Sequence, residues 1–350
     1  MANVFIATNN GDIGGGEVML LNVAQAARSL GHSITVVTPS NPNNLREAAT
    51  NLGLQVIALE AKNRIEWVLA LRKWRRKNRD GYLWCNGLVP AFATSFQQKR
   101  IVHLHQEPKG IQLLACAVAK YSSLVTLVPS EFMASKVRGS TVFENWVSEP
   151  NLSKRSAVSS EEVVVGFIGR LALIKGIDVL ADAIAELNSR NGLPSYKLHV
   201  AGEPRFTSKS DQKVVGESLA RISNHTEFLG WVDPGTFFAG IDIFVCPSVW
   251  QEPFGLVVAE AMASRVPYIT TTVGALPEVS GRGYEHLVAP RDSSALASSI
   301  EELAETIRTD PNLIRELQSN QYSRWQKHFS PGAGAERVSR LLESLVRENP

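Results

Sequence analysis

The sequence predicts an α/β protein of two Rossmann-like domains that face one another across a cleft. In the first half, short β-rich runs alternate with longer segments of helical period, and the same alternation returns in the second half. This alternation is typical of a parallel sheet wound with helices. A polar stretch between the halves holds Pro150, several serines and no apolar period, so we interpret it as a linker.

The elements are expected in two series. The strands of the first half are predicted at residues 4–8, 34–38, 55–59, 82–86, 100–106 and 124–130, with a helix at 18–30. Those of the second half are predicted at 163–169, 197–202, 225–230, 241–248, 267–271 and 286–290, with helices near 177–187, 256–262 and 294–308. A helix after residue 310 should end or kink at 330–332, because Pro331 and Gly332 interrupt it. We place the domains at 1–148 and 162–330, and the linker at 149–161.

Composition excludes several classes of protein. The 350 residues are 44% hydrophobic and 20% charged, which is ordinary for two globular domains, and a formal charge of +2 gives no overall attraction to nucleic acid or anionic lipid. The three cysteines form neither a CxxC pair nor a metal-ligand spacing, which favours a reducing compartment. We find no secretory signal and no membrane-spanning run, so a cytoplasmic protein is expected.

The strongest site signal is the segment CPSVWQEPFGLVVAEAMA, in which a strand ends and a helix begins. Glu252 falls in the loop and Glu260 about two turns up the helix, so the helix N-terminus lies between two carboxylates. Free amides at that N-terminus favour a pyrophosphate, which leaves one carboxylate for sugar hydroxyls and the other for ribose hydroxyls. The alternative is that the glutamates merely favour the helix dipole. The amides belong to Gly255, Leu256 and Val257.

A second segment, VVVGFIGRLALIKGIDVL, places two cations soon after a buried strand. Arg170 can grip phosphate oxygens through its planar fork, and Lys175 can approach as a point charge. Together they would neutralise a leaving diphosphate without a metal. The alternative, two solvated surface cations, is less favoured because glycines bracket both residues.

The first domain contributes a glycine-rich loop and a histidine pair. Gly15 and Gly16 follow the first strand and open a helix, where a ligand or backbone can come close. This is not GxGxxG, so a dinucleotide fingerprint is weak. In IVHLHQEP, His103 and His105 lie on one face of a strand. No further ligand stands at metal spacing, so we predict one buried histidine and place His105 in the cleft.

These segments resemble the retaining glycosyltransferase family 4, the group 1 transferases of the GT-B fold, over nearly the whole chain. The resemblance is carried by the GG-E loop, GHSITVV, FIGRL-x-x-x-KG, E-P-F-G-L-x-x-x-E-A-M-A and G-x-L-P-E-V. It implies a nucleotide-sugar donor, no cofactor and no metal, and the sequence has no DxD motif. It also implies that a C-terminal helix at 331–350 packs back on the first domain.

The resemblance implies a role for each site residue. Arg170 and Lys175 would bind the donor diphosphate, and Glu260 the ribose. Glu252 would face the donor sugar, while His105 would lie beside the transferred sugar and hydrogen-bond a hydroxyl. Amides near the phosphate and acceptor would come from Gly15 and Gly16.

Three positions depart from the family pattern. Trp146 replaces the glycine of an Asn-Gly pair after Asn145, Arg265 stands where a glycine is common, and GALPE replaces Gly-Gly-Leu-Pro-Glu. None of these is a carboxylate or cation named above. They bear on loop geometry and donor detail and leave the reaction class unchanged.

The expected reaction is retaining transfer of a hexose-type sugar from a UDP- or GDP-linked donor to a glycan, lipid-linked or small-molecule acceptor. A non-hydrolysing sugar-nucleotide epimerase and a non-catalytic nucleotide-sugar-binding subunit are the alternatives. An oxidoreductase is less favoured because its phosphate fingerprint is missing.

A basic stretch at 64–84 raises a membrane question. It mixes Trp67, Leu71 and Trp74 with six cations between Arg72 and Arg79. Such a helix can lie on anionic lipid at the inner face of a membrane, or it can be a surface helix whose apolar side is core. Both interpretations stay open.

Overall fold

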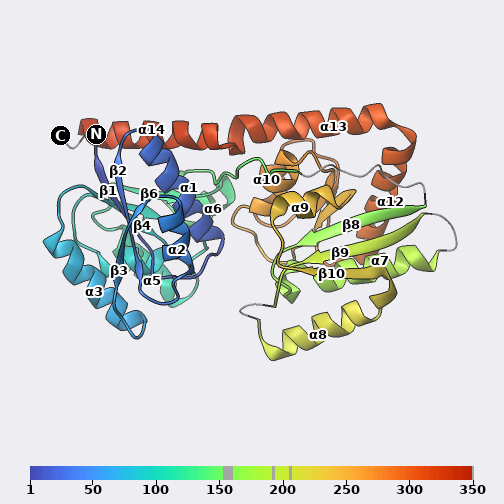
Figure 1. Ribbon diagram of the computed structural model, residues 1–350, viewed down its shortest axis with the longest axis horizontal. Helices are drawn as coiled ribbons and strands as arrows, with labels where there is room; N and C mark the ends of the chain where they lie inside the picture. Colours follow the sequence, from blue (N-terminus) through green and yellow to red (C-terminus); the bar gives the residue numbers. More distant parts are fainter. Residues whose placement is uncertain (153–160, 191–193, 205–206, 349–350) are drawn as a thin grey trace. The chain divides into compact units, whose positions relative to one another are not determined.

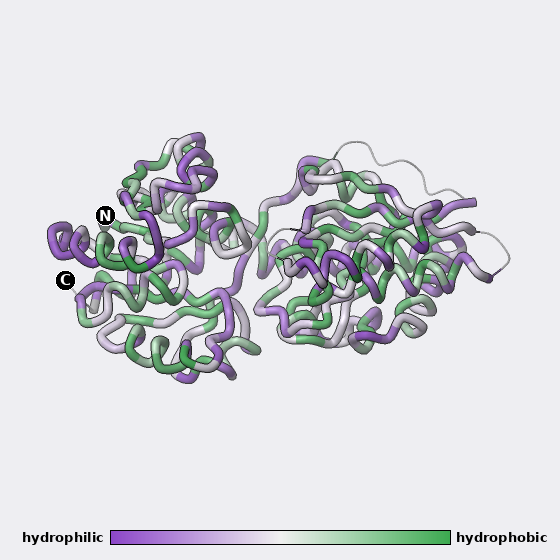
Figure 2. The backbone as a smooth tube through the Cα atoms, turned by 90° about the horizontal axis from the view of Figure 1, so that it is seen from below, coloured by the Kyte–Doolittle hydropathy of each residue, from purple (hydrophilic) through white to green (hydrophobic). Residues whose placement is uncertain are grey.

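The computed structural model describes residues 1–152, 161–190, 194–204 and 207–348 (Figure 1). The chain divides into two compact units, one made of Met1–Trp146 with Pro331–Pro350 and the other of Val147–Ser330. Most of the expected linker lies outside the described residues. Figure 2 shows hydrophobic stretches running through the interior of each unit and hydrophilic ones along its outer helices.

The first unit is built on a seven-stranded parallel sheet of order β3-β2-β1-β4-β5-β6-β7. Its strands are β1 (Asn3–Ala7), β2 (Ser33–Pro39), β3 (Gln55–Leu59), β4 (Tyr82–Asn86), β5 (Arg100–His103), β6 (Val125–Val128) and β7 (Thr141–Val142). Its helices are α1 (Gly15–Ser29), α2 (Asn44–Asn51), α3 (Arg64–Lys77), α4 (Leu88–Ala93), α5 (Ile111–Lys120), α6 (Glu131–Lys136) and α14 (Pro331–Glu348), and α14 packs against α1.

The second unit is built on a six-stranded parallel sheet of order β10-β9-β8-β11-β12-β13. Its strands are β8 (Glu162–Ile168), β9 (Ser195–Ala201), β10 (Thr226–Gly230), β11 (Ile243–Cys246), β12 (Tyr268–Thr271) and β13 (Leu287–Val288). Its helices are α7 (Ile177–Ser189), α8 (Lys209–Ala220), α9 (Pro234–Ala239), α10 (Leu256–Ala263), α11 (Leu276–Ser280), α12 (Ser293–Thr309) and α13 (Pro311–Arg324), with short helical turns at Leu173–Lys175, Ser223–His225 and Trp325–Phe329.

This architecture confirms the predicted fold class of two Rossmann-like α/β units. Each strand run expected from the sequence contains a strand, and the two-residue β7 is the one that the pattern did not reveal. In each sheet the order reverses between two neighbouring strands, β1 and β4 in the first unit and β8 and β11 in the second. Ligands of open α/β sheets bind at such a switch point, beyond the carboxyl ends of the strands.

The predicted break near residue 330 is narrower than expected. Ser330 alone is extended, with ψ of 161°, and α14 begins at Pro331. Proline is well tolerated in the first turn of a helix, where its missing N–H has no intrahelical partner to lose. Pro331 and Gly332 therefore start the last helix and do not separate two helices.

Helix α3 turns its tryptophans inward. Trp67 and Leu71 are buried in the core beneath the helix, and Trp74 packs edge-on against Phe5 with ring centroids 5.0 Å apart. Arg75 is also buried and donates to the carbonyl oxygens of three residues. The tryptophans of 64–84 thus belong to the core. Over the described residues, no helix is long and apolar enough to cross a bilayer.

Candidate active site

The cation-bearing loop of the second unit begins where β8 ends. Gly176 adopts a φ of 69°, and a Cβ atom there would lie 1.9 Å from the carbonyl oxygen of Pro247. Only glycine allows this approach. The backbone amides of Val249 and Trp250 both donate to the carbonyl of Ile174. The loops after β8 and β11, which flank the switch point, are therefore joined directly.

Lys175 and Glu252 meet at this junction. Nζ of Lys175 lies 2.5 Å from Oε1 of Glu252, and the hydroxyl of Ser248 donates to the same oxygen at 2.6 Å. The Glu252 side chain is 11% exposed and that of Lys175 28%. The lysine therefore has a carboxylate as its partner, and both groups stay open at one side.

A third loop fixes the backbone of Glu252. The amide of Ala275 donates to the Glu252 carbonyl at 2.8 Å, and Gly274 has a φ of 58° with no room for a Cβ atom, which would lie 2.3 Å from that carbonyl oxygen. Ala275 itself has a φ of −86°, a conformation open to any residue. In GALPE the first position, Gly274, needs glycine and has it, whereas the second position, Ala275, does not need the glycine of the family pattern.

Helix α10 begins where the loop that carries Glu252 ends. Gly255 is the N-cap with a φ of 102°. Within the described part of the chain, the amides that the sequence singled out make no hydrogen bond to the protein. They are available to an anion, which the helix dipole favours. These amides belong to Gly255, Leu256 and Val257.

Glu260 lies further along α10, and burial raises the pKa of its carboxyl to about 7. No described residue hydrogen-bonds this carboxyl. Arg170, in the loop after β8, is exposed and likewise has no ionic or hydrogen-bonding partner among the described residues. The cation and the carboxyl predicted to hold the donor are thus both without a partner in the part of the chain that the structure describes.

The predicted first-unit residues form a separate cluster. Glu17 braces the glycine loop, since its carboxyl accepts from the hydroxyl of Thr8 at 3.1 Å and from the amide of Gly14 at 3.2 Å. Burial raises the pKa of Glu17. This bracing holds Gly15 and Gly16 at the start of α1, beyond the end of β1.

Asn86, at the end of β4, connects this loop to His105. Its Nδ2 donates to the carbonyl of Gly16 at 3.0 Å, so its Oδ1 accepts from Nε2 of His105, 2.7 Å away. The proton of the imidazole therefore sits on Nε2, and Nδ1 is an enclosed nitrogen without a partner among the described residues. Burial lowers the pKa of His105 to about 4, which keeps the ring neutral at neutral pH.

His103 is the buried histidine of the pair. Its Nδ1 accepts from Nε1 of Trp84 at 3.3 Å, and its ring centroid lies 4.1 Å from that of His105. Burial lowers its pKa well below the usual range. The described residues contain no group of three or more His, Cys, Asp or Glu side chains suited to a metal ion.

Sequence reasoning missed Ser248, Asn86 and the bracing role of Glu17. Ser248 and Asn86 each stand at or just beyond a strand end, and that position was the available signal. Polar side chains there meet at one edge of a parallel sheet. What the sequence could not supply was the partner of each group.

Arg265 and Trp146, the two other residues that depart from the family pattern, each have partners nearby. Arg265 has a φ of 52°, unusual for a residue other than glycine, and its guanidinium stacks 3.5 Å from the ring centroid of Tyr322 and bonds Glu149 at 3.3 Å. Trp146 is buried in the first unit, where Asn22 donates to its carbonyl. The contacts of both residues involve none of the predicted donor-site residues.

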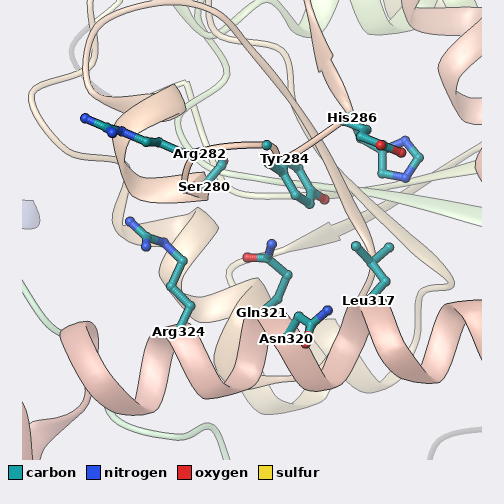
Figure 3. A pocket seen from close by; sticks show the side chains of 11 residues that line it. Ser280, Arg282, Tyr284, His286, Leu317, Asn320, Gln321 and Arg324 are labelled. Carbon is teal, nitrogen blue, oxygen red and sulfur yellow. The ribbon is translucent and has the colours of Figure 1, made fainter.

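A pocket of about 320 Å³ lies elsewhere in the second unit, between the loop after α11 and helix α13. Figure 3 shows Leu317, Gln321 and Arg324 projecting from α13 toward the loop that carries Tyr284. Arg324 already donates to two carbonyls of α11. The pocket includes none of the predicted site residues.

Known proteins resemble this chain in sequence and fold. Residues 162–306 match the family Glycosyl transferases group 1. The chain is 31% identical to the lipopolysaccharide core biosynthesis mannosyltransferase LpsB of Rhizobium meliloti, in a match that covers 52% of each protein. It is 25% identical to an uncharacterized 42.6 kDa protein in the cps region of Klebsiella pneumoniae, in a match that covers 77% of this chain and 84% of that protein. Its fold matches Anabaena Alr3699/HepE in complex with UDP-glucose, with a TM-score of 0.82, 20% identity, and coverage of 98% of this chain and 100% of the other. The family match thus lies within the second unit, and the likeness in structure shows that the chain has the GT-B fold.

Proposed function

We propose that this chain is a group 1 glycosyltransferase that moves a hexose-type sugar from a UDP- or GDP-linked donor to an acceptor, with retention of configuration and without a metal. One observation carries the proposal: at the switch point of the second unit, Lys175 pairs with Glu252 of the loop that leads into α10, a helix whose first amides have no partner among the described residues. That combination suits a sugar diphosphate. The structural likeness to HepE, which was solved with UDP-glucose, supports a donor of this kind.

The donor diphosphate would bind to the amides of α10, and Arg170 and Lys175 would neutralise its negative charge. Glu260 would accept from the ribose hydroxyls, and Glu252 would face the sugar. Lys175 then exchanges part of its bond to Glu252 for a phosphate oxygen. Since both partners keep an open side, the exchange needs no unfolding of the loop.

In the reaction, the bond between the sugar carbon and the diphosphate breaks with its electron pair on the phosphate oxygen. The acceptor hydroxyl forms its new bond on the face that the diphosphate leaves, and its proton passes to a diphosphate oxygen. Preorganised cations and amides stabilise the negative charge that develops on the leaving group. His105, held neutral, would hydrogen-bond the sugar beside the positive centre.

We assign the donor to the unit Val147–Ser330 and the acceptor to the unit Met1–Trp146 with Pro331–Pro350. A glycan, a lipid-linked glycan or a small molecule would be bound by loops of the first unit. The three free cysteines are all buried, which suits a reducing cytoplasmic compartment. Peripheral contact of 64–84 with the inner face of a membrane would rest on its exposed cations and on Ile65 and Leu69, since its tryptophans lie in the core.

Turnover of nucleotide sugars, with and without candidate acceptors, tests the proposal. A transferase releases UDP or GDP in step with glycoside formation and only when an acceptor is present. An epimerase yields an isomer or free nucleotide without an acceptor, and a binding subunit yields no product. Either of the last two results overturns the assignment.

A thermal-shift screen against UDP, GDP, ADP and their sugars identifies the base. A ligand present at about 100 times its Kd stabilises the folded protein by about 2.7 kcal/mol. We expect a clear rise in melting temperature with UDP or GDP compounds and a smaller one with ADP.

A further inference from the structure

We propose that helices α4 and α5, flanked by the cations of α3, form a surface that docks the first unit on an anionic bilayer and brings a lipid-linked acceptor to its site. The second half of this inference rests on the proposed function. The first half, bilayer binding, stands on the surface alone.

Helix α5 is apolar around most of its circumference and yet mostly exposed. Its sequence is IQLLACAVAK, and among its residues only Cys116 and Ala119 are buried. Ile111 is 86% exposed and Leu114 69%. A helix that is hydrophobic all round normally lies in a protein core or in lipid. In this unit the core covers one edge of the helix and leaves the rest open.

Neighbouring elements extend the apolar surface. Helix α4 packs against α5 and α3, and it exposes Phe92. Phe96, just beyond α4, is 64% exposed, and its ring centroid lies 5.4 Å from that of Tyr121, the residue after α5, with the rings tilted by 55°. Phe96 has a φ of 67°, a conformation that costs a residue other than glycine energy and that tends to mark functional positions. We name the whole set the docking face: Ile65, Leu69, Phe92, Phe96, Ile111, Leu113, Leu114 and Tyr121.

The charge around the docking face selects an anionic partner. Residues 62–121 carry twelve Lys and Arg against three Asp and Glu, while the whole chain has a formal charge of only +2. Of the twelve, Arg75 and Arg100 are buried, and the other ten reach the surface. Exposed apolar side chains in a segment rich in cations suit the boundary between lipid headgroups and acyl chains.

The same charge disfavours a second copy of this chain as the occupant. A two-fold dimer through the docking face would place its cations against the partner's cations. Like charges brought together across an interface suppress association. An anionic bilayer satisfies both the apolar and the basic parts of the face.

Position links the docking face to the candidate site. Helix α4 starts two residues after Asn86, and α5 starts six residues after His105. Both helices therefore begin at the carboxyl edge of the sheet, where these two side chains hydrogen-bond to one another. A bilayer that covers the docking face would bring the headgroup of a lipid-linked acceptor to the edge that carries His105.

Cosedimentation of the full chain with phosphatidylcholine vesicles, with and without phosphatidylglycerol, tests the inference. We expect binding to the anionic vesicles that weakens at least about tenfold in high salt, and little binding to neutral ones. The double variant Leu113→Glu with Leu114→Glu should lose at least about tenfold in vesicle affinity, because it places carboxylates where lipid would lie. The matched control is Leu313→Glu on α13, a leucine that is 52% exposed in the second unit, and it should bind as the parent does.

Two results overturn the inference. One is the absence of salt-sensitive binding to anionic vesicles. The other is self-association that the double variant abolishes while vesicle binding stays unchanged, which would make the face a dimer interface. The melting temperature and the shift produced by UDP or GDP check that each variant is folded. Vesicle binding requires no turnover, so its failure is separable from failure of the proposed function.

Discussion

Nζ of Lys175 lies 2.5 Å from Oε1 of Glu252, across the two loops that flank the switch point of the second sheet. The pairing gives a half-buried lysine a counter-charge. Under the proposed function, a donor phosphate would replace part of this pairing and Glu252 would turn to the sugar.

Lys175→Ala should lower turnover by about 10- to 1,000-fold, the range for losing a key electrostatic donor. The loss should appear in kcat, because the charge on the diphosphate develops as the bond breaks. Steady-state kinetics with a saturating acceptor measures it. Lys197→Ala is the control, because Lys197 forms an exposed pair with Glu162 at 2.8 Å and should leave kcat unchanged. Full activity in Lys175→Ala would remove this lysine from the mechanism.

Glu260→Gln should change how the stability of the ligand-free protein depends on pH. The folded pKa of Glu260, about 7, lies above the ordinary value of 4.5, so between these values the folded state holds more protons than the unfolded state. The free energy of unfolding of the parent therefore falls as pH rises through this window, by up to about 3 kcal/mol. The glutamine variant lacks this loss, so it should be the more stable protein at pH 8 and nearly equal at pH 4.5. Urea titrations of both proteins at both pH values measure the free energies of unfolding. If the difference between the two proteins is the same at both pH values, the prediction is wrong.

The sequence predicts well what depends on pattern. Alternation locates the strands, and strand ends locate Glu252, Lys175 and His105, because a parallel sheet gathers its carboxyl ends at one edge. It does not predict pairings between side chains, since the partner depends on rotamers and on loops far apart in the chain. The bond from Lys175 to Glu252 spans 77 positions, and the bond from Asn86 to Gly16 spans 70.

The helical stretch at 64–84 shows the same limit. Its composition permits a lipid-facing or a core-facing tryptophan row, because both leave the same spacing of apolar residues along the helix. Only the contact of Trp74 with Phe5 and the burial of Trp67 decide between them.

Asn86 should act on catalysis through His105. Asn86→Ala removes the acceptor that fixes the proton on Nε2, so the ring loses its orientation and kcat should fall about 10- to 100-fold with little change in the KM for the donor. Asn86→Asp keeps an acceptor at the same place, and its carboxylate raises the pKa of His105 by favouring the charged ring. This variant should recover part of kcat, and the acidic limb of its pH–rate profile should move to higher pH. A purely structural role would lower stability in both variants and leave the pH profile of each unmoved.

Gly334 and Trp146 form the remaining testable pair, because the tryptophan stands where the family pattern has a glycine and a glycine of α14 makes room for it. A Cβ atom at Gly334 would lie 2.3 Å from Cδ2 of Trp146, and the guanidinium of Arg337 lies 5.6 Å from the ring centroid. Gly334→Ala should therefore cost about 1–3 kcal/mol of stability through overpacking.

The control and a second variant separate packing from helix propensity. Gly216→Ala in α8 meets nothing within 4 Å and should stabilise the protein by about 0.5–1 kcal/mol, as alanine does in a helix. If the ring of Trp146 is the obstacle, adding Gly334→Ala to Trp146→Ala should cost much less than adding it to the parent, because the space has been vacated. Urea unfolding of the parent, Gly334→Ala, Trp146→Ala and the double variant gives this coupling directly. Equal costs in the two backgrounds would mean that the backbone of α14, and not the tryptophan, requires the glycine.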